Sequence, residues 1–137
     1  MHLCPEVKGR ITLEGKPLAN QKIERSLTLE EDEYDFVYTD DDGNFSFVAK
    51  SLKSKLPGSL FYQTVIRIII DLEYHGEIYN LWYGYQHGLK TPVEFKKHLL
   101  KLNADLTTKE KDHHLVNPNK SSEEYYIGSI CRWDEQE

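Results

Sequence analysis

The stretch of sequence that decides the fold is Thr39-Asp40-Asp41-Asp42-Gly43-Asn44-Phe45-Ser46-Phe47. Two β-rich runs, residues 34–39 and 44–48, flank an Asp- and Gly-rich turn, so the pattern predicts a β-hairpin. Gly43 is expected to take a positive φ, at which a side chain would strain the backbone. Asp40, Asp42 and Gly43 are therefore expected to form a structural turn.

Strand patterns extend outward on both sides of this turn. Residues 7–13 alternate between apolar and polar side chains and end at a turn at 15–17, and a further strand is expected at 21–29. The most apolar run, residues 65–74, is followed by a turn at 75–77 and a strand at 78–85. Strict alternation in that last strand would line up four residues on one side, namely Tyr79, Leu81, Tyr83 and Tyr85. Later strands are expected at 103–106 and 125–133.

The periodicity changes at Thr91-Pro92-Val93-Glu94, which has the form of a capping box with proline at the first helical position. Apolar residues at helical spacing come next, so one helix is predicted near residues 92–101. The pattern as a whole predicts a mainly β protein: a Greek-key β-sandwich with one appended α-helix. Residues 1–137 are expected to form a single domain, with a core sandwich at 5–90 and the helix and C-terminal strands at 91–137.

Charge and hydropathy exclude several classes of partner. The 137 residues include 17 basic and 23 acidic side chains, and the net charge of −6 argues against nucleic acid and favours a cationic partner. The sequence contains no long apolar run, so no membrane segment is expected. The start of the chain lacks the layout of a secretory signal. A cytoplasmic location is therefore expected, or a periplasmic one if a signal has been removed.

The two cysteines, Cys4 and Cys131, lie near opposite ends of the chain and favour free thiols. A disulfide between them stays open as an alternative if the first and last strands pair. His113 and His114 fall in a predicted polar loop. Adjacent residues of an extended segment point to opposite faces, so this pair favours a surface loop over a zinc site.

The aspartates of residues 40–42 could also serve as calcium ligands, since a hard cation prefers oxygen. A loop of the EF-hand kind needs an acidic residue at its twelfth position, and none stands there. A turn is the better interpretation. No metal and no cofactor are expected, and the sequence shows neither a nucleophile motif nor a phosphate-binding loop.

Aromatic density is the surface feature that points to binding. Rings crowd the hairpin at residues 74–85 and the tail, and a sandwich core cannot usually enclose both faces of such strands. The alternative is that these rings simply fill the core. The binding interpretation places an acidic rim, either at residues 30–33 or at 40–42, around aromatic anchors. The candidate binding residues are Tyr79, Trp82, Tyr83, Tyr85, Tyr125, Tyr126, Glu31, Asp32 and Glu33.

Three motifs carry a resemblance to a known family: Val7-x-Gly9-x-Ile11, Gly15-x-Pro17-Leu18 and Thr39-Asp40-x-x-Gly43-x-Phe45-x-Phe47. They resemble the carboxypeptidase-regulatory-like, or transthyretin-like, β-sandwich family. Leu81-Trp82-Tyr83 and the closing Gly128-Ser129-Ile130-Cys131-Arg132-Trp133 look like a small uncharacterised family of Gram-negative bacterial proteins with this sandwich. The resemblance implies a non-enzymatic bacterial domain linked to secretion-system effectors and their immunity proteins.

The function expected first is therefore protein binding, as an immunity or accessory protein that neutralises a secreted toxin of the type VI kind. Such toxins are often cationic, and complementary charge speeds association. A carbohydrate- or peptide-binding module is the alternative, because tyrosine and tryptophan rings stack on sugars. A transthyretin-like hydrolase is disfavoured, because that branch ends in Tyr-Arg-Gly-Ser and this chain does not.

Overall fold

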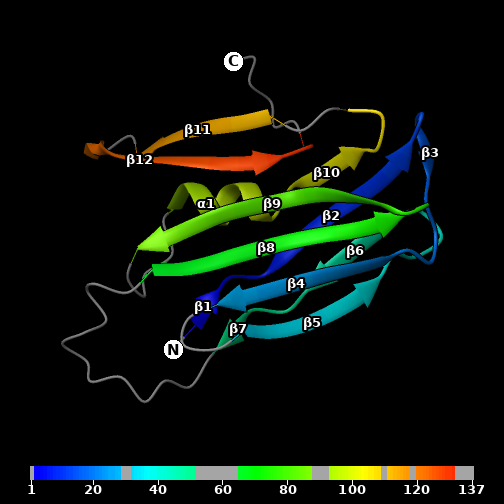
Figure 1. The fold of residues 1–137 in the computed structure, drawn as a ribbon, viewed down its shortest axis with the longest axis horizontal. Coiled ribbons are helices and arrows are strands. Elements are labelled where there is room, and N and C mark those ends of the chain that lie inside the picture. Colours follow the sequence, from blue (N-terminus) through cyan, green and yellow to red (C-terminus); the bar gives the residue numbers. More distant parts are fainter. Residues whose placement is uncertain are drawn as a thin grey trace.

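The computed structural model describes residues 2–28, 32–51, 65–87, 93–108, 111–117 and 120–131. These residues form twelve strands and one helix (Figure 1). In chain order the elements are β1 (His2–Cys4), β2 (Val7–Leu13), β3 (Lys16–Pro17), β4 (Lys22–Thr28), β5 (Asp32–Tyr38), β6 (Asn44–Phe47), β7 (Lys50–Ser51), β8 (Val65–Tyr74), β9 (Glu77–His87), α1 (Val93–Leu99), β10 (Leu102–Asp105), β11 (Lys111–Asn117) and β12 (Lys120–Ser129).

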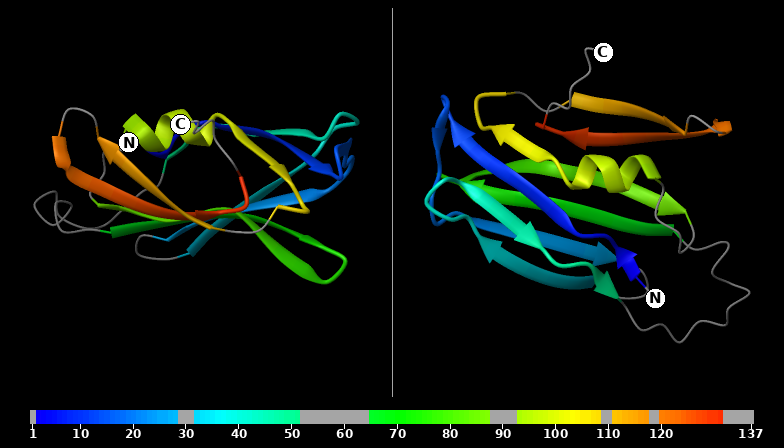
Figure 2. Two further views of the ribbon diagram at one scale, coloured as in Figure 1. Left: turned by 90° about the horizontal axis from the view of Figure 1, so that it is seen from above. Right: turned by 180° about the vertical axis from the view of Figure 1, so that it is seen from behind.

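The strands are arranged in two main layers. A six-stranded sheet has the order β11-β12-β9-β8-β4-β5, and a four-stranded sheet contains β10, β2 and β3 in that order with β6 also paired to β2. β1 and β7 form a separate two-stranded sheet. The view from behind in Figure 2 shows β6, β2, β10 and α1 lying across one face of the six-stranded sheet. The prediction of a mainly β sandwich with one helix is confirmed.

The core lies between these layers and reflects the period-two pattern of the strands. Alternate residues of β8, from Ile66 to Leu72, are buried, as the sequence predicts. They meet Ile11, Phe45 and Phe47 from the four-stranded sheet, together with Phe95 and Leu99 from α1. The helix therefore belongs to the second layer and closes one end of the core.

The expected hairpin at residues 34–48 is wrong, although its turn is real. β5 pairs with β4 in the six-stranded sheet, whereas β6 pairs with β2 in the other sheet. The turn at residues 40–43 thus carries the chain from one layer to the other. Asp40 Oδ1 accepts hydrogen bonds from the Asp42 and Asn44 amides, each at 2.9 Å. Gly43 has the positive φ that the sequence predicts, 81°, and a Cβ there would collide with the Ile11 carbonyl.

Strict alternation in β9 is also wrong, because the strand contains a β-bulge. Ile70 pairs with Trp82 but the next residue of β8, Asp71, pairs with Asn80, which leaves Leu81 as the extra residue. Leu81 and Trp82 are consequently both buried, and Tyr83 and Tyr85 turn to the opposite face. The hairpin turn before β9, at residues 75–76, is as predicted.

The C-terminal third is integrated into the sandwich more closely than an appendage would be. α1 spans residues 93–99, shorter than the predicted 92–101, and its capping residues 91–92 lie outside the described part. β10 pairs in parallel with β2, so it extends the four-stranded sheet. His113 and His114 lie in β11, paired with residues 127 and 126, and the expected polar loop at this position is wrong.

Both cysteines are buried, and neither forms a disulfide. Pairing between the first and last strands, on which the disulfide alternative depended, does not occur: β1 pairs with β7, and β12 pairs with β9 and β11. Burial raises the pKa of the Cys4 thiol to about 11, against a smaller opposing effect of the nearby Arg25 guanidinium.

Candidate functional site

The outer face of the six-stranded sheet is the side turned away from the core. Side chains on this face line up in rows across β5, β4, β8 and β9, because the strands pair in register. The three central rows are Phe36–Glu24–Asp71–Asn80, Tyr34–Ser26–Ile69–Tyr83 and Asp32–Thr28–Arg67–Tyr85. Each row thus ends in an aromatic residue on β5, on β9 or on both, and the charged residues between the rings belong to the first and third rows.

The exposed rings on this face are here named the aromatic strip: Tyr34, Phe36, Tyr38, Tyr83 and Tyr85. The three rings on β5 are 59, 52 and 57% exposed in chain order, and the two on β9 are 38 and 46% exposed. Phe36 and Tyr38 contact edge to face at 5.8 Å, as do Tyr83 and Tyr85 at 6.2 Å. Several large rings held open to water on one sheet are typical of a binding surface.

A shallow acidic pocket of about 520 Å³ adjoins the strip where β8 ends and β4 begins. It is lined by three carboxylates, Glu24, Asp71 and Glu73, together with Lys22, His75 and Ile78. Among the described residues none of the three carboxylates forms an ion pair. Partial burial, and then the negative charge of Glu24, raise the pKa of Asp71 above its usual value. A cation in the pocket would oppose both effects, because its positive charge favours the ionised carboxylates.

Lys22 connects the pocket to the strip. Its ammonium group lies 4.5 Å from the centre of the Phe36 ring, within the range of a cation–π contact. The face therefore already contains one cation on an aromatic ring. This local geometry shows that a lysine side chain fits against the β5 rings.

A polar cluster centred on Thr28 lies at the opposite end of the face from the acidic pocket, where β4 ends and β5 begins. Its hydroxyl donates to Asp32 at 2.6 Å and accepts from Arg67 at 3.2 Å. The Tyr34 hydroxyl donates to the same carboxylate at 3.1 Å. The hydrogen bond from Thr28, and then that from Tyr34, lowers the pKa of Asp32. This end of the face is locally neutralised, which leaves the acidic pocket as the charged end.

Beneath the strip, a buried ion pair fixes β5 to β4. The Arg25 guanidinium donates to both oxygens of Asp35, at 3.0 and 2.6 Å, and to the Val48 carbonyl at 3.0 Å. It also stacks over the Phe47 ring at 4.6 Å. A bidentate pair restricts orientation as well as distance. It therefore holds β5, and the rings that β5 carries, in a defined position.

The structure gives mixed outcomes for the aromatic residues predicted to bind. Tyr83 and Tyr85 lie on the outer face. The prediction that Trp82 is a surface anchor is wrong. Its side chain is fully buried and packs on Phe95, with ring centres 5.1 Å apart, because the bulge turns it inward. Tyr79 is half-buried against the core and donates to Glu77. Tyr125 and Tyr126 lie in β12, and their side chains fall outside the described residues.

The acidic rim also differs from the expected one. Asp32 and Glu33 begin β5 instead of capping a loop, and Glu31 falls outside the described residues. The 40–42 turn is tied to β2, where Arg10 donates to the Asp42 carbonyl at 2.9 Å. The rings Tyr34, Phe36 and Tyr38 were missed, although their spacing of two residues was the signal for one shared strand face.

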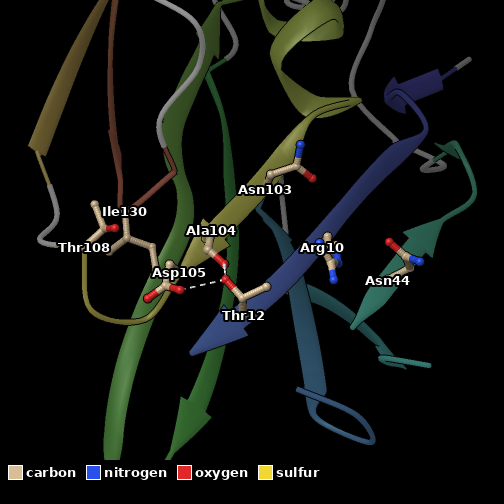
Figure 3. Close-up of a pocket in the computed structure, with 8 residues that line it drawn as sticks. All are labelled: Arg10, Thr12, Asn44, Asn103, Ala104, Asp105, Thr108 and Ile130. Atoms are coloured by element: carbon tan, nitrogen blue, oxygen red, sulfur yellow. Dashed lines mark hydrogen bonds between the residues drawn. The ribbon is translucent and has the colours of Figure 1, made fainter. Parts of the chain in front are cut away.

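A second pocket, of about 470 Å³, lies over the four-stranded sheet (Figure 3). Its carboxylate, Asp105, accepts hydrogen bonds from Thr12, Thr107 and the backbone amides of the Glu14–Gly15 turn, at 2.6–3.2 Å. These donors outweigh desolvation and hold the pKa of Asp105 well below its usual range. A carboxylate engaged in this way fastens β10 to the β2–β3 turn, which is a structural role.

Metal centres and membrane helices are two other features that the described residues lack. Within the described ranges, no group of three or more His, Cys, Asp or Glu side chains is placed to hold a metal ion. No helix in this part of the chain is long and apolar enough to cross a membrane.

The fold and this face define a β-sandwich protein with an exposed aromatic and acidic sheet surface. The chain belongs to the family described as domain of unknown function (DUF6795), whose model matches residues 7–109. The matched region contains the entire aromatic strip and acidic pocket, and β11 and β12 come after it. No curated protein and no solved structure matches the chain.

Proposed function

We propose that this chain is a non-enzymatic binding protein that holds a cationic protein partner against its outer face. The observation that carries the proposal is the combination of five exposed rings with a pocket of three carboxylates that lack ion pairs among the described residues. Aromatic rings supply most of the binding free energy at interfaces, and unpaired carboxylates select the sign of the partner's charge.

The net charge of the chain, −6, supports the same choice of partner. A negative net charge attracts a basic protein over long range and so accelerates association, and it repels nucleic acid. The partner that fits this chemistry, and the bacterial resemblance of the sequence, is a cationic secreted toxin of the type VI kind. In that role the chain is an immunity or accessory protein that covers the toxin's basic surface.

The test uses the product of the gene adjacent to this one, co-expressed with the chain and purified for titration calorimetry. We expect a complex, and we expect cells that produce the adjacent product to be rescued by the chain. The charge variant Glu24→Gln with Glu73→Gln should bind at least about tenfold more weakly. The matched control, Glu6→Gln with Asp41→Asn, removes two exposed carboxylates elsewhere and should bind normally.

The salt dependence provides an independent readout. Raising ionic strength should weaken wild-type binding by reducing the association rate, and the charge variant should show a smaller salt effect. If the chain neither binds nor protects, or if charge variant and control behave alike, the proposed function is wrong.

A carbohydrate-binding function is supported by one observation, the Tyr83–Tyr85 pair beside the Arg67 guanidinium. Exposed aromatic rings with polar neighbours also suit sugars, which can stack on a ring face. Glycan-array binding that is lost in Tyr85→Ala and kept in Leu100→Ala would favour this second function over the first.

A further inference from the structure

We infer that the partner adds a lysine- or arginine-containing strand to the free edge of β5 and extends the six-stranded sheet. The inference rests on the proposed function and specifies how the partner would be held. It concerns the edge of the sheet, a surface distinct from the rows of side chains on the outer face.

β5 is the last strand of its sheet, and its outer backbone groups lack partners in the described part of the chain. Among the described strands, Asp32–Tyr38 pairs with β4 alone. Within the described ranges, no hydrogen bond outside the ladder with β4 involves a backbone group of these seven residues. Backbone N–H and C=O groups aligned along an edge form a template for another strand.

Three of the usual protections of a sheet edge, namely a bulge, proline and lysine, are missing from β5. The strand pairs with β4 over seven consecutive residues without a bulge, and it contains neither proline nor lysine. The other edge strand, β11, begins with a lysine and has a register shift in its pairing. Among the described strands, β5 is thus the long, regular edge that is open to pairing, and the Arg25–Asp35 pair holds it in place.

Charge identifies the strand that fits. β5 carries three carboxylates and no basic residue. Asp32 and Asp35 already lie near cations of the chain, so Glu33 is the carboxylate of β5 that forms no ion pair among the described residues. A second copy of this chain is disfavoured: antiparallel self-pairing centred on Asp35 would place that residue opposite itself, and each copy has a net charge of −6. A cationic strand would instead be attracted both by the side chains of β5 and by the net charge of the chain. Its apolar or β-branched residues would pack beside the exposed rings of Tyr34, Phe36 and Tyr38.

The test uses amide hydrogen exchange, measured by NMR on the full chain. The probe is an acetylated and amidated heptapeptide of alternating lysine and valine. We expect it to protect those amides of β5 that point away from β4, at alternate positions, and to leave β8 unchanged. A fully N-methylated analogue keeps the charge and the valines, but its methyl groups replace the backbone donors and keep the peptide from approaching the edge closely, so it should protect none of these amides.

Reversing one charge on β5 tests whether the added strand must be positively charged. Glu33 is exposed and forms no ion pair among the described residues, so Glu33→Lys should weaken binding of the lysine peptide by about threefold and strengthen binding of a glutamate–valine peptide. Val48→Lys, at an exposed apolar residue outside β5, is the control and should produce a smaller effect.

Each contrary outcome has one meaning. If both peptides perturb the outer face equally and β5 stays unprotected, strand addition is wrong while the proposed function is unaffected. If the lysine peptide does not bind, strand addition is also wrong, and the co-expression experiment decides the proposed function separately. If light scattering shows a dimer whose β5 amides are protected without peptide, the occupant is a second copy and the inference is overturned.

Discussion

The ion pair beneath the aromatic strip predicts an asymmetry between its two partners. The Arg25 side chain is 1% exposed, whereas that of Asp35 is 34% exposed and has Lys50 at 4.0 Å as a second cation. Removing Asp35 leaves a fully buried guanidinium, which cannot shed its charge, without its carboxylate. Removing Arg25 leaves a carboxylate that water and Lys50 can still reach. The cost of the two changes should therefore differ.

The magnitudes depend on this difference in exposure. Breaking a buried ion pair by removing one partner costs about 3–5 kcal/mol. Arg25 keeps its contacts with the Val48 carbonyl and the Phe47 ring but loses its carboxylate, so Asp35→Ala should lower the free energy of unfolding by about 4 kcal/mol. Arg25→Met keeps most of the buried volume, and solvent reduces its cost to about 2 kcal/mol. The double variant leaves neither charge, and it should cost no more than Arg25→Met alone, about 2 kcal/mol.

Urea unfolding, monitored by the fluorescence of the buried Trp82 and by circular dichroism, measures all four proteins of this cycle. Arg25→Lys is the control for geometry, because it keeps the charge but loses the bidentate contact. Two results would contradict this asymmetry: a cost of Asp35→Ala no greater than that of Arg25→Met, or costs of the two single changes that simply add in the double variant.

Three further predictions concern the titratable groups. Asp105→Asn should lower the free energy of unfolding by about 1–2 kcal/mol at neutral pH. Since the pKa of Asp105 is depressed in the folded protein, this stability is lost as pH falls. The difference in unfolding free energy from wild type should therefore close in acid, and a constant difference would contradict the assignment. Asp71→Asn should instead stabilise the protein at pH 7, because the pKa of Asp71 is raised in the folded protein and its ionisation opposes folding. Unfolding curves of wild type and variant should show this gain fade toward pH 3.8, and a destabilised variant would contradict the prediction. Cys4, with a pKa of about 11 and a buried thiol, should resist iodoacetamide at pH 8 until urea unfolds the chain, as mass spectrometry would record; rapid labelling of the native protein would disprove its burial.

The sequence predicts the strands well because one period-two pattern determines both burial and local structure. β8 is an example: from Ile66 to Leu72, every second residue is apolar and faces the core. The Gly43 turn is another, because its φ is a local property. Which strands the turn connects is not local. β5 and β6 separate into different sheets: β5 pairs with β4 over seven residues, and β6 pairs with β2 over four.

The site could be predicted only in part, for a related reason. The sequence directs attention to aromatic residues and to an acidic surface, and Tyr83 and Tyr85 do lie on the outer face. A bulge adds one residue without a sequence signal of its own, and it shifts the inward and outward alternation of the strand by one position between its two sides. Trp82 therefore enters the core. The partnership of Arg25 with Asp35 depends on strand register, which the composition of neither strand reveals.

We propose that the aromatic strip binds a cationic protein partner. The ratio of dissociation constants for the adjacent gene product between two matched double variants tests this proposal. Phe36→Ser with Tyr38→Ser removes two rings from the strip, and Val48→Ser with Leu100→Ser removes two exposed apolar side chains elsewhere. Equal melting temperatures would first establish that both variants fold. We expect the strip variant to bind at least about tenfold more weakly than the control variant, and equal dissociation constants for the two would contradict the proposal.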